Sequence, residues 1–158
     1  MNKYKKIIGS VVVLLFGLCG ILLILMMLMS DLKNSTIFDF LIFTILYPAM
    51  ICFVAVSIVG IINESYRIAA IYSLIYGIIV SVLVNVIILV NIETEVIAEL
   101  VANTPSSEAI IITTSEPGGF GDVLTSVLLF ATVGAAGGMI GAKIRKFYNK
   151  KRRSFENS

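Results

Sequence analysis

The chain has 158 residues, of which 58% are hydrophobic and only 14% are charged, and its formal net charge at pH 7 is +2. A soluble domain of this size is about half apolar and about a quarter charged. Here the apolar residues come in blocks too long for a water-soluble core, so the sequence indicates a single membrane domain. The lack of histidine removes the commonest general base and the commonest nitrogen ligand for metals.

Four apolar stretches follow one another along the chain, at residues 7–30, 37–62, 68–90 and 123–144. Each is longer than the roughly 20 residues with which a helix crosses about 30 Å of hydrocarbon. A segment in lipid has to satisfy its own backbone hydrogen bonds, so a helix is expected even where isoleucine and valine are frequent. The sequence therefore predicts an all-α polytopic membrane protein with four transmembrane helices. The third of these has apolar residues at helical spacing as far as residue 102.

The charges are distributed unequally between the two ends of these helices. Eleven of the twelve basic residues, all but Lys33, lie before the first helix, between the second and third, or after the fourth. Eight of the ten acidic residues lie on the opposite side. Because Lys and Arg in short loops mark the cytoplasmic side of a membrane, the sequence predicts a cell-membrane protein with both termini cytoplasmic. The loop at residues 91–122 is then acidic and outside.

The tail at residues 143–158 is strongly basic and carries interleaved aromatic residues. A juxtamembrane cluster of this kind attracts anionic lipid headgroups, at about 1 kcal/mol per basic residue near the surface. Nucleic acid is not needed to explain the cluster, and none is expected as a partner. The residues expected to contact lipid headgroups are Lys143, Arg145, Lys146, Lys150, Lys151, Arg152 and Arg153.

Small and polar residues form ordered stripes on two of the predicted helices. They recur every four residues, so the members of each stripe share one helix face. In the fourth helix a parallel row, Gly137 and Gly141, lies beside the stripe. The members of the two stripes are Ser73, Gly77, Ser81 and Asn85 in the third helix, and Gly134 and Gly138 in the fourth.

These stripes have two interpretations. In the first they are a packing seam, because lipid gives helices little hydrophobic reason to pair and close approach through small residues has to supply it. In the second, Ser73, Ser81 and Asn85 line a narrow polar path. Asn85 fits both, as an interhelical hydrogen bond worth about 0.6 to 2 kcal/mol or as part of a path. No charged residue lies in the middle of a predicted helix, which disfavours ion-coupled transport.

Three other residues within the apolar stretches, one proline and two cysteines, have special structural or chemical properties. Pro48 removes a backbone donor from the second helix and predicts a kink there. Cys19 and Cys52 lie at similar depths on adjacent helices, where two small apolar side chains are favoured over a redox pair. The cysteines lack metal-ligand spacing, so the sequence predicts no metal, cofactor or catalytic site.

The chain has four short helices, predicted cytoplasmic ends, and a glycine-rich last helix that runs into a basic tail at residues 134–146. This layout resembles that of small uncharacterised prokaryotic four-helix integral membrane proteins, archaeal ones among them. The resemblance covers the layout of most of the chain and implies the membrane class, and it carries no assigned active residues.

Three classes of function are compatible with these patterns. The favoured hypothesis is a non-enzymatic membrane protein, either a homo-oligomer or an accessory subunit that packs against a partner membrane protein through its small-residue faces. The alternative is a small transporter or channel with a polar path along the third helix. An intramembrane enzyme is least favoured, because the chain has no histidine and no metal-ligand pair.

Overall fold

The computed structural model describes residues 3–31, 35–91, 102 and 120–156, and almost all of the described residues are helical. The predicted acidic loop, and with it the continuation of the third helix toward residue 102, lies almost wholly outside them. The elements are α1 (Lys3–Ser30), α2 (Ile37–Leu41), the π-helical turn η2 (Ile42–Leu46), α3 (Tyr47–Asn63), α4 (Tyr66–Asn91) and α6 (Phe120–Glu156).

Four helices are long and apolar enough to span a membrane, which confirms that part of the prediction. They are α1, the run from α2 to α3, α4, and most of α6. The largest difference from the prediction is in α6, which runs to Glu156, twelve residues past the predicted end of the apolar stretch. The Lys and Arg residues end the apolar stretch, but they are good helix formers and do not end the helix. Neither glycine nor proline, which would break the helix, follows Ala142.

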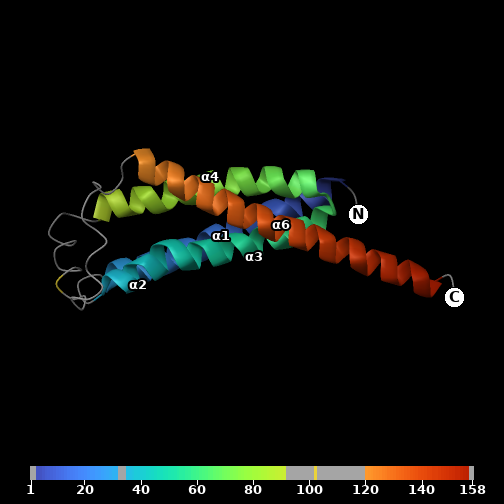
Figure 1. Ribbon diagram of the computed structural model, residues 1–158, viewed down its shortest axis with the longest axis horizontal. Coiled ribbons are helices and arrows are strands. Elements are labelled where there is room, and N and C mark those ends of the chain that lie inside the picture. Colours follow the sequence, from blue (N-terminus) through green and yellow to red (C-terminus); the bar gives the residue numbers. More distant parts are fainter. Residues whose placement is uncertain (1–2, 32–34, 92–101, 103–119, 157–158) are drawn as a thin grey trace.

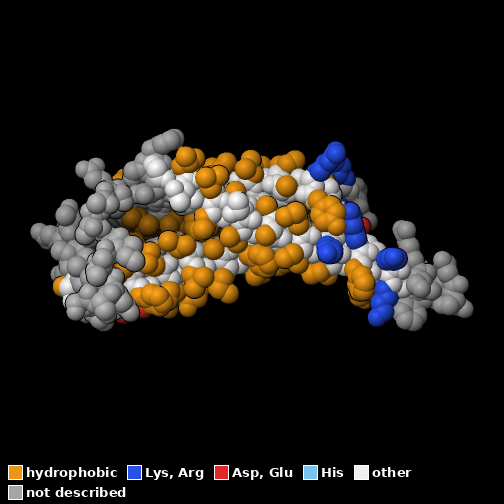
Figure 2. All heavy atoms as spheres, viewed as in Figure 1, with side chains coloured by type: hydrophobic (Ala, Val, Ile, Leu, Met, Phe, Trp, Pro, Cys, Tyr) orange, Lys and Arg blue, Asp and Glu red, His pale blue; other side chains and the backbone are white. Residues whose placement is uncertain are grey.

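The four long helices form a bundle in which α6 lies across both α3 and α4 (Figure 1). Helix α1 packs mainly against α3, behind α6 in this view. Helix α1 begins, α3 ends and α4 begins at the same end of the bundle, and α6 leaves the bundle there. We call this the basic end, because it carries the exposed Lys and Arg side chains seen in Figure 2.

The start of α2 is fixed by a reciprocal cap. The Asp39 backbone N–H donates to Thr36 Oγ1 at 3.2 Å, and the Thr36 N–H donates to Asp39 Oδ2 at 3.1 Å. A capping box of this kind satisfies two of the N–H groups that a helix leaves unpaired at its start. The second long helix therefore begins sharply at Ile37.

Pro48 is accommodated by the π-helical turn η2 directly before it. The Tyr47 N–H donates to Ile42 O, five residues back, so the helix widens by one residue before the proline ring. The Thr44 hydroxyl donates to Phe40 O at 2.7 Å inside the same turn. The proline was predicted to bend the helix through its missing donor, and the wider turn is how the structure accommodates it. The helical run from Ile37 to Asn63 continues through it.

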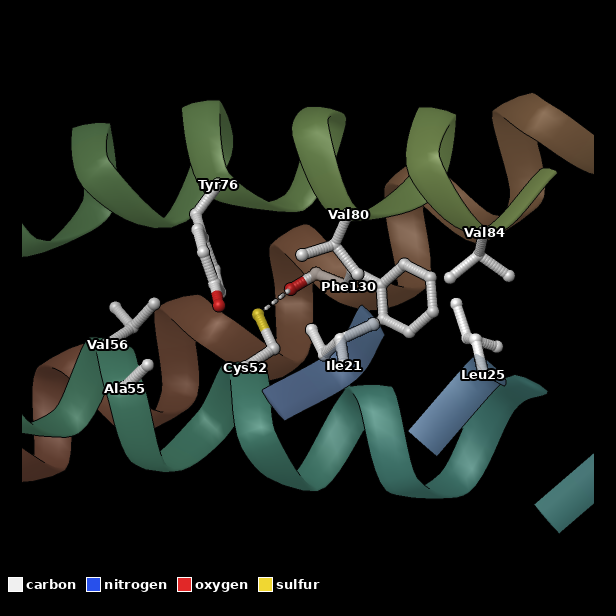
Figure 3. Packing of buried hydrophobic residues seen from close by; sticks show 9 residues of the cluster. All are labelled: Ile21, Leu25, Cys52, Ala55, Val56, Tyr76, Val80, Val84 and Phe130. Carbon is white, nitrogen blue, oxygen red and sulfur yellow. Dashed lines mark hydrogen bonds between the residues drawn. The ribbon is translucent and has the colours of Figure 1, made fainter. Parts of the chain in front are cut away.

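The core of the bundle combines side chains from all four long helices (Figure 3). Its two aromatic residues, Tyr76 and Phe130, are almost fully buried. The Tyr76 hydroxyl lies where a side chain at Gly17 would be, and it has no hydrogen-bond partner among the described residues. The buried members of this cluster are Ile21, Leu25, Cys52, Ala55, Val56, Tyr76, Val80, Val84 and Phe130.

The outer surface of the bundle is apolar along most of its length (Figure 2). Large hydrophobic side chains are exposed on every long helix, for example Phe16 at 77% and Leu128 at 58%. Helix α1 is the least buried of the four candidate spans. A soluble monomer rarely exposes contiguous apolar surface on this scale, so this surface is suited to contact with lipid or with another apolar surface.

Candidate functional site

Helices α4 and α6 approach each other closely at Gly77. A Cβ atom added there would lie 2.7 Å from the Ala131 backbone N and 2.9 Å from its Cα, closer than real side chains come. One turn earlier, the Ser73 hydroxyl donates to Ala131 O at 2.7 Å. The backbone of α6 therefore leaves no room for a side chain at residue 77, and it lies directly against the Ser73 hydroxyl.

The same pair of helices is joined by a polar cluster further from the basic end. The Ser81 hydroxyl lies against Val123 O at 3.2 Å and against the Ser126 hydroxyl. Asn85 Nδ2 donates to Ser81 O at 2.8 Å and to Ser126 Oγ at 2.9 Å. The Asn85 amide is thus bonded across the helix pair. We call the contact formed by Ser73, Gly77, Ser81, Asn85, Ser126 and Ala131 the α4–α6 seam.

The second glycine row of α6 packs against α3. A Cβ at Gly137 would lie 2.5 Å from Phe53 O, and one at Gly141 would collide with Ser57 O. On the α3 side, a Cβ at Gly60 would collide with the Gly138 carbonyl oxygen. We call this contact of Phe53, Ser57 and Gly60 with Gly137, Gly138 and Gly141 the α3–α6 seam.

The first glycine row of α6 faces the line where α3 and α4 meet. A Cβ at Gly134 would lie 2.6 Å from Ser73 Oγ of α4 and 3.2 Å from Cys52 Sγ of α3. At Gly138 it would lie 2.9 Å from Ala69 Cβ of α4. The two glycine rows therefore let one helix, α6, pack closely on two neighbours at once.

All six residues of the predicted stripes thus lie at contacts within a single chain. Ser73, Gly77, Ser81, Gly134 and Gly138 are buried, and Asn85 is half-buried. Sequence reasoning did not identify Ser57 or Gly60 as part of this contact. Their four-residue rhythm is weaker, and Gly60 is the lone glycine of α3. The small-residue faces are covered by the chain's own helices, which leaves the outer apolar surface for any second chain.

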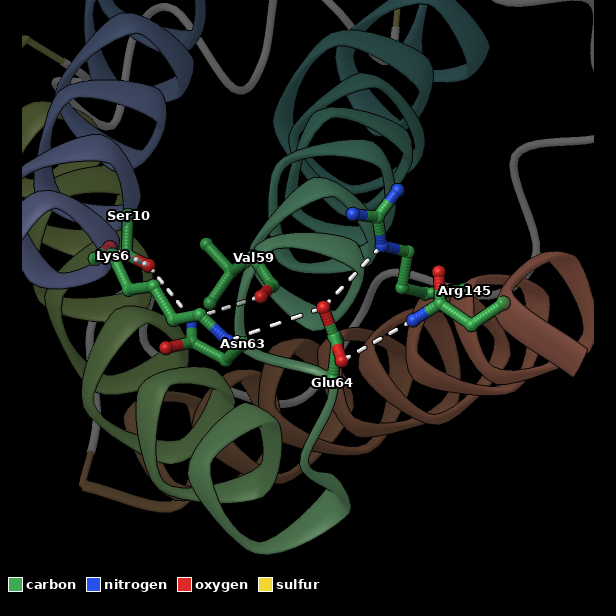
Figure 4. Close-up of polar contacts among 7 residues, drawn as sticks. Lys6, Ser10, Val59, Asn63, Glu64 and Arg145 are labelled. Carbon is green, nitrogen blue, oxygen red and sulfur yellow. Dashed lines mark hydrogen bonds and ion pairs between the residues drawn. The ribbon is translucent and has the colours of Figure 1, made fainter. Parts of the chain in front are cut away.

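The carboxylate of Glu64 contacts polar side chains of α1 and α6 at the basic end (Figure 4). Glu64 Oε1 lies 3.4 Å from Arg145 Nε of α6 and 4.0 Å from Lys6 Nζ of α1, and its Oε2 accepts from Asn149 Nδ2 at 3.4 Å. These side chains are partly exposed, and such pairs stabilise by less than about 1 kcal/mol each. The main effect of the contacts is to connect the start of α1 and the end of α3 with α6.

The backbone of Glu64 is unusual as well. Its φ of 58° is the only positive value of a non-glycine residue among the described residues. In this left-handed conformation Glu64 caps α3, with its N–H donating to Gly60 O at 3.0 Å. Sequence reasoning missed this residue. The signal was there, since Glu64 is one of only two acidic residues on the predicted basic side.

Asn63 ties α3 to α1 beside the Glu64 cluster. Its Nδ2 donates to Ser10 Oγ of α1 at 2.8 Å and to Val59 O of its own helix at 2.9 Å. The Ser10 hydroxyl in turn donates to Lys6 O at 2.8 Å. Both N–H bonds of the Asn63 amide are therefore used within the protein.

The basic residues of the tail begin beside the basic end of the bundle, where Arg145 contacts Glu64, and continue along the end of α6, which extends past the bundle (Figure 1). Lys143, Lys146, Lys150, Lys151 and Arg152 are exposed, and Arg145 is half-buried beside Glu64. The Lys146 ammonium lies 4.1 Å from the centre of the Tyr66 ring, a cation–π distance. The side chain of Arg153 lies outside the described part of the chain.

The two cysteines lie in different environments. Cys19 is exposed on α1, whereas Cys52 is buried and its Sγ lies 3.4 Å from Phe130 O. The interpretation of the two cysteines as separate small side chains stays a prediction.

Comparisons of the chain with protein-family models, with curated proteins and with solved structures gave no match.

Proposed function

We propose that the chain is a four-span integral protein of the cell membrane that acts as a non-enzymatic subunit, in a homo-oligomer or beside a partner membrane protein. One observation carries this proposal. Ser73, Ser81 and Asn85 bond across the helix pair in the interior, while the outward faces are apolar. In lipid such a bundle has an outer surface that lipid or a second apolar chain covers equally well.

Helix α1 is the surface that best suits a second chain. It is the least buried span, and its exposed side chains include Phe16 at 77% and both Met26 and Met27 at 67%. Flexible methionine side chains adapt to irregular partner surfaces. The glycine rows of α6 are filled from within the chain, so α1 replaces the small-residue faces as the proposed docking face.

The alternative function, a polar path along α4, has less support from the contacts. A path through the α4–α6 seam would have to displace the Ser73 bond to Ala131 O and widen the contact at Gly77, whose Cβ position is already blocked. The Gly77 contact joins two helix backbones and does not open by a change of rotamer, and rotation of Ser73 alone would break its bond without widening that contact. The seam is therefore proposed as structural.

The proposed orientation places the basic end in the cytoplasm, because Lys and Arg concentrate there. We expect a membrane-impermeant thiol reagent to label Ser106→Cys on intact cells, and to label Ser65→Cys and Phe155→Cys only after the cells are opened. The background chain carries Cys19→Ala and Cys52→Ala. Labelling of Ser65→Cys from outside would contradict the four-span orientation.

Replacement of Asn85 separates the two functions. Asn85→Leu removes the bonds to Ser81 O and Ser126 Oγ, so we expect a loss of about 1 kcal/mol in the free energy of unfolding. We expect wild type, solubilised in mild detergent, to have a mass above that of one chain, and proteoliposomes of either protein to show no solute flux. The matched control is Val86→Leu, on the exposed face one residue away.

A different pair of results would contradict the subunit proposal. A monomeric wild type that conducts a solute, together with a stably folded Asn85→Leu that does not, would replace the subunit proposal by the transport one. A wild type that assembles and conducts no solute, together with an Asn85→Leu that still assembles, would support the subunit proposal with α1 as its docking face.

A further inference from the structure

A cleft opens at the basic end between the first turns of α1 and α4. It has a volume of about 460 Å³ and is lined by Lys3, Lys6 and Ile7 of α1, Asn63 at the end of α3, and Ile68 and Tyr72 of α4. Sites for small molecules occupy about 300 to 1,000 Å³, so the cleft is large enough for a phosphate-containing headgroup.

The cleft has more positive than negative charge around it. Lys3 and Lys6 are three residues apart on α1, and so lie on one face of the helix. Of the carboxylates whose side chains the structure describes, Glu64 is the one at this end, and it lies closer to Arg145 (3.4 Å) than to Lys6 (4.0 Å). The Lys6 charge is thus weakly compensated, and Lys3 has no ion pair with a described carboxylate. An anion in the cleft would compensate the positive charges of Lys3 and Lys6.

Charged and apolar side chains lie side by side in the lining of the cleft. Lys3, Lys6 and Ile7 are among the first five residues of α1 and Ile68 is in the first turn of α4, while Tyr72 lies one turn further along α4, toward the apolar middle of the bundle. The Asn63 amide is held in place by Ser10 and Val59 and forms a fixed part of the wall (Figure 4). Lysine ammonium groups beside the apolar side chains of Ile7, Ile68 and Tyr72 match a molecule with an anionic head and a hydrocarbon body.

We propose that this cleft is a stoichiometric binding site for one anionic glycerophospholipid, with its phosphate between Lys3 and Lys6 and the start of an acyl chain against Ile7 and Ile68. The proposal rests on the membrane insertion proposed above. It differs from the lipid contact expected of the α6 tail, whose exposed lysines attract a charged surface without enclosing a headgroup. A basic pocket between helices instead holds one headgroup in a defined place.

The test is a lipid titration of the delipidated full chain in detergent, followed by native mass spectrometry. We expect one dioleoylphosphatidylglycerol to bind per chain, and Lys3→Gln/Lys6→Gln to weaken its binding about 30-fold, from about 1 kcal/mol for each lysine. The matched control is Lys150→Gln/Lys151→Gln, which removes the same charge from the exposed part of α6 and should change binding less than about twofold. Lys3→Gln alone, which leaves the Lys6–Glu64 contact intact, should weaken binding about fivefold and covers the case in which the double variant does not fold.

Three results would overturn the proposal. Equal weakening by the two double variants would show a diffuse charge effect without a site. Equal affinity for dioleoylphosphatidylcholine, whose headgroup has no net charge, would show that the lysines do not select the ligand. Displacement of the lipid by inorganic phosphate at millimolar concentration would show a site for a free anion that does not use the apolar walls.

Failure of this proposal can be told apart from failure of the membrane proposal. Membranes from the expressing cells are washed with alkaline carbonate before the lipid titration. A chain that resists extraction but binds phosphatidylglycerol no better than phosphatidylcholine keeps its place as a membrane protein and loses the lipid site. A chain that the wash releases loses both.

Discussion

Gly141→Ala is expected to separate α6 from α3 and to lower the free energy of unfolding by about 3 kcal/mol. The added methyl group would collide with Ser57 O and lie 2.8 Å from the Ser57 carbonyl carbon. Both atoms belong to a helix backbone, so no change of rotamer relieves the contact, and overpacking of this kind costs about 1 to 3 kcal/mol or more. Thermal unfolding in detergent measures the effect.

The control for this prediction is another glycine-to-alanine change in a helix. At Gly20 the nearest atom to an added Cβ is Ile51 Cδ1 at 3.7 Å, an ordinary contact. Alanine is a better helix former than glycine by about 1 kcal/mol, so Gly20→Ala should be neutral or stabilising. If Gly141→Ala and Gly20→Ala unfold at the same temperature, α6 does not pack on α3 as closely as the structure has it.

Phe130→Ala is expected to destabilise the bundle by about 2 to 3 kcal/mol. Phe130 is 1% exposed and packs in the core shared by all four long helices (Figure 3). Removal of a buried aromatic ring from a soluble protein costs about 3 to 5 kcal/mol, as lost transfer free energy plus a cavity. In lipid the separated helices stay in an apolar solvent, so the cavity supplies most of the loss and the cost is smaller.

The comparison for Phe130 is Leu128→Ala, two residues away on the exposed side of α6. Leu128 is 58% exposed, so its truncation leaves no cavity and should change the stability by less than about 0.5 kcal/mol. Unfolding of both variants in a mixed detergent and denaturant titration gives the difference directly. An equal loss for the two variants would contradict the assignment of Phe130 to the core and Leu128 to the outer surface.

Length and hydropathy were enough to predict the four long helices, because the thickness of a bilayer sets a minimum that few other structures meet. The start of α2 at Ile37 and the end of α1 at Ser30 agree with the predicted stretches. The end of α6 does not, since hydropathy detects where lipid would end and not where a helix ends. The π-helical turn before Pro48 has no signature in the sequence beyond the proline itself.

The stripes on α4 and α6 could be found from periodicity, which assigns residues to a face. Periodicity does not say which helix covers that face. Only the structure shows that Gly77 lies against Ala131, and that Gly141 lies against Ser57 of a third helix. The Glu64 cluster was harder still, because it joins residues from α1, the α3–α4 turn and α6 that share no local pattern.

The uninterrupted course of α6 has a mechanical consequence. The helix has 37 residues and is about 56 Å long, nearly twice the hydrocarbon thickness of about 30 Å. Its last seven residues, from Lys150 to Glu156, follow the contact of Asn149 with Glu64 and form a stiff arm of about 10 Å. Because the arm is rigid, each 10° change in the tilt of α6 moves its far end by about 2 Å relative to the bundle. The charges on the arm therefore move as one body with the glycine rows inside the bundle.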